Sequence, residues 1–163
     1  MLIYIVRHAI AEERGPNISE NERALTEEGK NKMHRVSQGL RKINVRPNVI
    51  LTSPLRRSLE TAQILVEHLP SASLEKMPAL SAGAEPNAII SALRGYAKLD
   101  EVMLVGHQPD LGRLVSHLLT GDASQVNVDF KKGAVVCVET ELAQRRSPAV
   151  LLWMLTPKQL RAF

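Results

Sequence analysis

Three short polar groups each follow directly on an apolar run, and together they contain the residue types that bind and attack a phosphoryl group. They are Arg7-His8-Ala9, Thr52-Ser53-Pro54 with the adjoining Arg56 and Arg57, and Gly106-His107-Gln108. Arginine offers forked donors that match phosphate geometry and keeps its positive charge. Neighbouring arginines repel a further positive charge and so favour a neutral histidine. A neutral imidazole is a nucleophile, so these groups predict phosphoryl transfer.

The apolar runs before these groups predict the strands of one sheet. Leu2–Val6, Val49–Leu51 and Val102–Val105 are continuous apolar segments, typical of strands buried on both faces. Segments with apolar residues at helical spacing separate them, which predicts an α/β fold with a largely parallel sheet and helices on both faces. In such sheets, ligands bind beyond the carboxyl ends of the strands. The three polar groups are therefore expected to meet at one end of the sheet.

The whole chain, residues 1–163, is expected to form a single three-layer domain with no lid or cap insertion. Two late strands, over Ala134–Val138 and Ala149–Leu155, are joined by a charged turn over Glu141–Pro148 rather than by a helix. One of them is therefore predicted to be antiparallel, at an edge of the sheet. The polar stretch Ala9–Arg23, which contains Gly15-Pro16-Asn17, is predicted to be a loop.

Capping residues mark the expected helix starts. Thr26 is predicted to cap one helix, and Ser53 to cap another with Pro54 at its first position. Pro86 and Pro109 are expected to begin two more helices.

Composition and charge exclude several classes of function. The formal net charge is a mild +4 and aromatic residues make up only 3% of the chain, too few for a base-stacking platform, so no nucleic-acid partner is expected. No apolar run approaches the ~20 residues that a membrane span needs, and Met1–Val6 lacks the features of a signal peptide. We therefore expect a cytoplasmic protein without membrane contact. The single cysteine, Cys137, is predicted to be a buried apolar residue.

The same residues resemble the signatures of the histidine phosphatase superfamily, the group that includes phosphoglycerate mutases. Val6-Arg7-His8-Ala9 is similar to its Arg-His-Gly signature, with alanine in place of glycine. Ser53–Ala62 resembles the pattern Ser-Pro-x-x-Arg-x-x-x-Thr-Ala, and Val105-Gly106-His107 resembles the third signature. Arg23–Gly29 is similar to the Arg-Pro-Leu-Thr-x-x-Gly element of the small SixA-type phosphohistidine phosphatases, without its proline.

This resemblance implies a role for each matching residue. His8 is the expected nucleophile, which forms a phosphohistidine intermediate, and Arg7, Arg23, Arg57 and His107 are expected to hold the phosphoryl oxygens. No metal or other cofactor is expected, because positioning and charge carry most of the catalysis in phosphoryl transfer.

Two further residues have alternative interpretations. Glu85 is the best candidate for a general acid, or else a loop carboxylate that caps the helix at Pro86. Ser53 either contacts the phosphate or serves only as a helix cap. Neither alternative is decided by the sequence.

The expected activity is dephosphorylation of phosphohistidine on a signalling protein by a monomeric enzyme. An imidazole leaves more easily than an alkoxide, so a site without a strong general acid favours it. The alternatives are a phosphatase of small phosphate esters with the same pocket and, from another class, an inactive phosphate-binding module. A mutase is disfavoured because nothing resembles a lid.

The remaining histidines carry no predicted function. His34 and His68 lie within predicted helices and are expected to face solvent. His117 follows His107 at a spacing that suits no metal site.

Overall fold

The computed structural model describes residues 1–13, 15, 19–141 and 148–163 of the chain. Most of the predicted turn over Glu141–Pro148, and all but Gly15 of the Gly15-Pro16-Asn17 segment, lie outside the described residues. The strands are β1 (Leu2–Arg7), β2 (Val49–Thr52), β3 (Ser73–Lys76), β4 (Glu101–Gly106), β5 (Val135–Glu139) and β6 (Val150–Leu155). The helices are α1 (Glu27–Lys42), α2 (Arg56–His68), α3 (Pro86–Leu93), α4 (Asp110–Thr120) and α5 (Pro157–Leu160), with short 3-10 turns at Pro78–Leu80 and Arg94–Tyr96.

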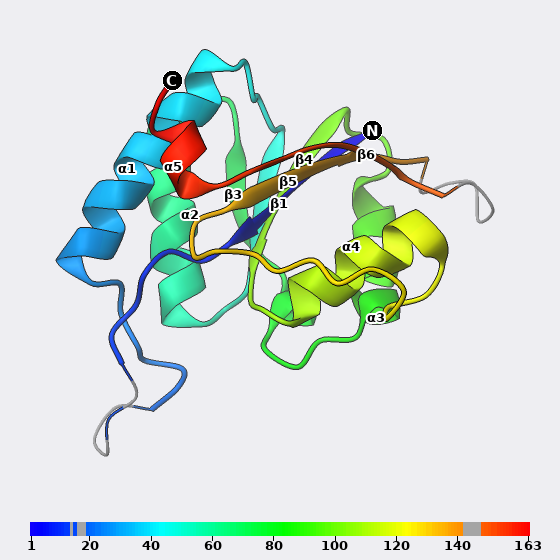
Figure 1. Cartoon of the computed structure of the whole chain (residues 1–163), viewed down its shortest axis with the longest axis horizontal. Coiled ribbons are helices and arrows are strands. Elements are labelled where there is room, and N and C mark those ends of the chain that lie inside the picture. Colours follow the sequence, from blue (N-terminus) through cyan, green and yellow to red (C-terminus); the bar gives the residue numbers. More distant parts are fainter. Residues whose placement is uncertain (14, 16–18, 142–147) are drawn as a thin grey trace.

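One six-stranded sheet in the order β3-β2-β4-β1-β5-β6 forms the middle layer of the protein (Figure 1). The strands β1 to β4 run parallel, and β5 is antiparallel to both of its neighbours. The predicted α/β fold with a mostly parallel sheet is thus confirmed. The antiparallel strand lies one position inside the edge rather than at it, because β6 pairs with the outer side of β5.

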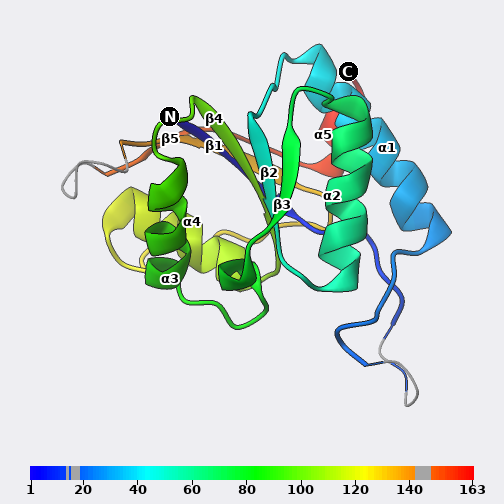
Figure 2. The ribbon, with the colours of Figure 1, turned by 180° about the vertical axis from the view of Figure 1, so that it is seen from behind.

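Alternating side chains on the strands build two separate cores. On β1, Tyr4 and Val6 pack on the side of α1, α2 and α5, whereas Ile3 and Ile5 pack on the side of α3 and α4. Figures 1 and 2 show these two groups of helices on opposite faces of the sheet. This arrangement is the expected three-layer domain, and it explains why the central strands are apolar on both faces.

Most helices begin where the capping residues of the sequence predict. The Thr26 side chain accepts a hydrogen bond from the Gly29 amide at the start of α1, and α3 begins at Pro86 as predicted. The prediction for α2 was wrong: this helix begins at Arg56, with Leu55 in the N-cap position. Ser53 is therefore not its cap.

Cys137 is buried in the core, as predicted. Among the helices of the described ranges, none combines the length and the apolar character that crossing a membrane requires.

Candidate active site

Strand register brings the three polar groups together. In the parallel sheet Arg7 lies opposite Gly106, and Thr52 lies opposite Val105, so the residues after each strand emerge side by side. The His8 amide donates to the Gly106 carbonyl over 3.1 Å. The helices that follow β1 and β4 cover opposite faces of the sheet, and the space between two such strands is where α/β proteins bind ligands. The predicted meeting point is confirmed.

His8 is buried and held in one tautomer. Its Nδ1 lies 2.8 Å from the Ala9 carbonyl oxygen, which only accepts, so Nδ1 carries the proton. The lone pair is then on Nε2, which accepts from Nε of Arg57 over 3.3 Å. Burial lowers the pKa of His8 to about 4. The hydrogen bond to Ala9 opposes this shift, and the positive charges of Arg57 and Arg7 add to it. At neutral pH the side chain is therefore an uncharged nucleophile.

His107 lies beside His8, with 5.3 Å between the ring centroids. Its Nε2 is 2.8 Å from Oγ of Ser53, and the same oxygen accepts from the Leu55 amide. Among the described residues, Nε2 of His107 is the one acceptor within reach of the buried Ser53 hydroxyl hydrogen, so we assign that hydrogen to Nε2 and the proton of the neutral ring to Nδ1. Burial first, and then the neighbouring His8, lower the pKa of His107 to about 3.

Two buried nitrogen atoms at this site have no hydrogen-bond partner among the described residues. They are Nδ1 of His107 and Nε of Arg7. Arg7 donates through Nη1 to the Phe130 carbonyl, which fixes the position of its guanidinium group. Because buried donors in folded proteins are almost always paired, these two are suited to the oxygens of an incoming anion.

Glu20 joins two of the predicted phosphate-binding arginines. Its carboxylate lies 2.7 Å from Nη1 of Arg23 and 3.4 Å from Nη2 of Arg57, and its carbonyl accepts from Nη1 of Arg57 over 2.6 Å. Arg23 also donates through Nε to the Glu12 carbonyl. The structure therefore connects Arg23 to the site through Glu20 rather than through a contact with either histidine. Glu20 was not among the predicted residues, and its i,i+3 spacing to Arg23 is the one local signal for it.

The contacts of Ser53 and Glu85 differ from the roles that the sequence suggested for these two residues. Ser53 is fully buried and contacts His107, so its hydroxyl orients a site histidine instead of capping a helix. Glu85 pairs through both carboxylate oxygens with Arg113, at 3.2 and 2.8 Å, and makes no side-chain cap for α3. Glu85 thus occupies the N-cap position of α3 without capping it through its carboxylate, and its described contacts do not join it to His8 or His107.

Thr61 was part of a matched motif without an assigned role. Its hydroxyl oxygen accepts from the Ala9 amide over 3.0 Å and donates to the Arg57 carbonyl over 2.6 Å. It ties the segment after β1 to the first turns of α2. Apart from glycines, Asn44 alone among the described residues has a positive φ, so Ala9 adopts a backbone conformation open to any residue. Alanine at this position therefore causes no backbone strain.

Comparisons with known proteins agree with this geometry. The family model described as Histidine phosphatase superfamily (branch 1) matches residues 3–82. An uncharacterized protein of Picosynechococcus sp. is 30% identical, over 98% of this chain and 99% of its own length. The chain belongs to the histidine phosphatase superfamily.

Solved structures of the same fold include several phosphatases. The protein histidine phosphatase SixA complexed with tungstate superposes with a TM-score of 0.85 at 23% identity, covering 98% of this chain and 99% of SixA. The α-ribazole phosphatase from Shigella flexneri gives a TM-score of 0.78 at 16% identity, covering 96% and 97%. At these identities the likeness shows a shared fold.

Proposed function

We propose that this protein is a phosphatase that acts through a phosphohistidine intermediate on His8. The observation that carries the proposal is the pairing of a buried, neutral His8 with unsatisfied donors on Arg7 and His107. Nε2 of His8 carries the lone pair and now accepts from Arg57; when the Arg57 donor turns to a phosphoryl oxygen instead, the lone pair is free to attack phosphorus. Arg57 completes the group, and Arg23 acts through Glu20.

The reaction proceeds in two displacements at phosphorus. Nε2 of His8 forms a P–N bond while the bond to the leaving group breaks, and the leaving group departs with the electron pair and takes up a proton. Water then attacks the phosphorus of phosphohistidine, which releases inorganic phosphate and restores neutral His8. Arg7, Arg57 and His107 hold the phosphoryl oxygens throughout, so that their hydrogen bonds strengthen as the transition state forms.

The substrate that suits this site best is phosphohistidine on a partner protein. Glu85 is paired with Arg113 through both carboxylate oxygens, and none of its described contacts places it beside His8, so it is not positioned as a general acid for the leaving group. Imidazole is protonated near neutral pH and leaves without a strong general acid, whereas an alkoxide does not. The chemistry of the leaving group therefore favours a phosphoramidate.

A small phosphate ester is the second candidate. A cavity of about 190 Å³ is lined by Gln108, the residue that follows His107 in the chain, and by Gly112, Arg113 and Val128. The buried Oε1 of Gln108 has no partner among the described residues. A small leaving group with a hydroxyl or amide donor would fit there.

The deciding experiment traps the intermediate. The protein is incubated with a ³²P-labelled phosphohistidine protein, and we expect a labelled enzyme that is acid-labile, base-stable and absent from His8→Ala. No labelled enzyme and no turnover would favour a phosphate-binding module instead.

A substrate panel then separates the two phosphatase candidates. We expect kcat/KM to be higher for the phosphohistidine protein than for alkyl phosphates. The reverse order, with Gln108→Ala raising KM for the small ester alone, would support the second candidate.

A further inference from the structure

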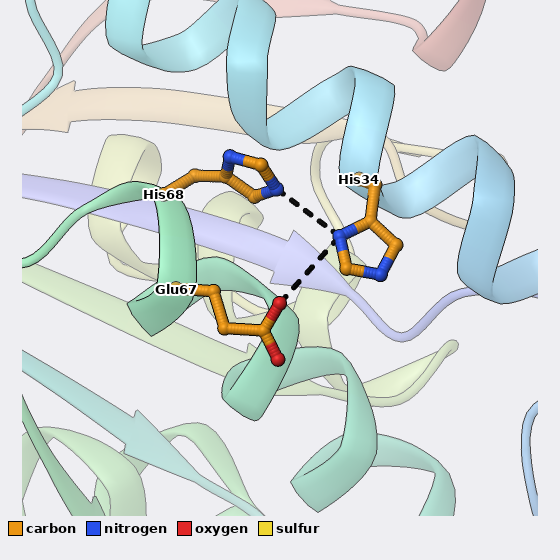
Figure 3. A group of neighbouring side chains, drawn as sticks. All are labelled: His34, Glu67 and His68. Atoms are coloured by element: carbon orange, nitrogen blue, oxygen red, sulfur yellow. Dashed lines mark hydrogen bonds and ion pairs between the residues drawn. The ribbon is translucent and has the colours of Figure 1, made fainter.

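A cluster of two histidines and one glutamate joins α1 to α2, away from the catalytic residues. Figure 3 shows His34 of α1 facing Glu67 and His68 at the end of α2. Nδ1 of His34 lies 3.1 Å from Nε2 of His68 and 3.7 Å from Oε2 of Glu67. Both histidines are partly exposed, in keeping with the expectation that they face solvent, but the packing of α1 on α2 also brings them into contact with each other, which the sequence did not indicate.

The spacing of these atoms matches what a single small metal ion requires. Zinc binds histidine nitrogen at about 2.0–2.1 Å and carboxylate oxygen at about 2.0–2.2 Å, usually in tetrahedral geometry. Two ligand atoms in such a shell are then about 3.3–3.5 Å apart. The separations of 3.1 and 3.7 Å fall on either side of this value, and the three ligand atoms all lie within 4.8 Å of one another.

The donor types are also those of a transition-metal site. Neutral imidazole nitrogen suits zinc, copper and nickel, and one carboxylate adds negative charge. Both histidines are half-buried and Glu67 is exposed, so an ion can enter from solvent and keep a water molecule as its fourth ligand. One of the two facing ring nitrogens now donates to the other; with an ion bound, that hydrogen moves to the far nitrogen of the same ring, and both facing lone pairs point to the metal.

We propose that His34, Glu67 and His68 form a Zn²⁺ site that cross-links α1 and α2. The site is separate from the catalytic pocket. His68 lies eleven residues beyond Arg57 on α2, which corresponds to about 16 Å along the helix axis. A bound ion stabilises the packing of the two helices without blocking access to His8.

The test is metal binding by protein stripped with EDTA and dialysed into phosphate-free buffer. His8→Ala serves as the background, because His8 and His107 form a second pair of histidines that zinc might bind. In this background we expect one Zn²⁺ per chain by calorimetry. Co²⁺ should give the visible absorption of a tetrahedral site. At a hundredfold excess over Kd, the Tm should rise by roughly 5–10 °C.

Variants identify the ligands. His34→Ala, His68→Ala and Glu67→Gln should each weaken Zn²⁺ binding more than about tenfold and reduce the Tm shift at the same Zn²⁺ concentration by at least about half. His117→Ala, on α4, is the matched control and should bind as the background does. Glu67 is exposed, so its substitution does not endanger folding.

The outcome that overturns the proposal is zinc binding unchanged by His34→Ala and Glu67→Gln, or no binding at micromolar Zn²⁺. In otherwise wild-type protein, His34→Ala should retain full phosphatase turnover. These metal-binding measurements do not depend on the proposed catalytic function, so the two proposals can fail separately.

Discussion

The hydroxyl of Ser53 decides how His107 presents its ring to the site. Oγ of Ser53 is 2.8 Å from Nε2 of His107, whereas Oγ of Ser58 lies at 3.4 Å from the same atom. The shorter contact fixes the tautomer that directs an Nδ1 hydrogen into the pocket. A histidine whose orienting partner is removed rotates or takes the other tautomer and no longer donates there.

We therefore expect Ser53→Ala to lower kcat for an aryl phosphate by about 10–100-fold with little change in KM. Ser58→Ala, which removes the longer contact, is the matched control and should lose less. Steady-state kinetics on both variants make the comparison. Equal losses would show that Ser53 does not set the tautomer.

The Glu20 carboxylate pairs with two of the arginines that we propose bind the phosphate. Since it pairs with both Arg23 and Arg57, an incoming anion competes with it. Glu20→Gln keeps the shape and removes the charge, which should tighten inhibition by inorganic phosphate about fivefold, or ~1 kcal/mol. The competitive inhibition constant is the measurement. Glu22→Gln, an exposed neighbour in the same loop, should leave this constant unchanged.

The roles of residues that act through a tertiary contact could not be predicted from the sequence. The adjacency of Arg7 and His8, and the spacing of Arg57 from Ser53, are local patterns that predict a phosphate site. Glu20 and Thr61, by contrast, acquire their roles only when the segment after β1 folds onto α2. Nothing in their own neighbourhood in the sequence indicates that contact.

At the scale of elements, the backbone of α1 comes unusually close to the segment after β1. A Cβ added at Gly29 would lie 2.1 Å from the Ile10 carbonyl oxygen, which explains why the element similar to the SixA motif ends in glycine. The same close approach holds the start of α1 against the segment that carries Ala9.

Gly29→Ala should therefore destabilise the protein by about 1–3 kcal/mol and weaken phosphate inhibition, because the start of α1 must shift. Gly95→Ala is the control: its added Cβ meets no atom within 4 Å. Chemical denaturation and the phosphate inhibition constant report the two effects. Wild-type stability in Gly29→Ala would contradict the packing argument.

The sequence located most elements because apolar runs and capping residues are local signals. The order of the strands was not encoded locally: β4 lies between β1 and β2, and β5 separates β1 from β6. The start of α2 was misplaced because Ser53-Pro54 has the pattern of a helix cap, while the Ser53 side chain is instead buried against His107. A functional contact overrode the local preference there.

For the whole molecule, two buried neutral histidines make stability depend on pH. The pKa values of His8 and His107 fall to about 4 and about 3, whereas the unfolded chain has histidines near 6.5. Below that pH the unfolded state binds protons that the native state does not. This stabilisation is complete above about pH 6.5 and is lost as the pH falls toward 4 and then 3.

The expected result is a free energy of unfolding that falls between pH 6.5 and 4.5, by up to about 1.4 kcal/mol per pH unit for each of the two histidines. His8→Gln removes one titrating group, so the change of the free energy of unfolding per pH unit should decrease by the contribution of one proton. Urea denaturation across this range measures it. A slope identical to that of the wild type would mean that His8 is not held neutral.

The pairing of β1 with β4 determines when the anion pocket can form during folding. It joins residues near opposite parts of the chain, Arg7 and Gly106, and such distant contacts form slowly because a long loop must close first. Local helices can appear earlier without creating any part of the anion pocket. We therefore expect the pocket to form only when β1 pairs with β4, because His8 and His107 follow these two strands.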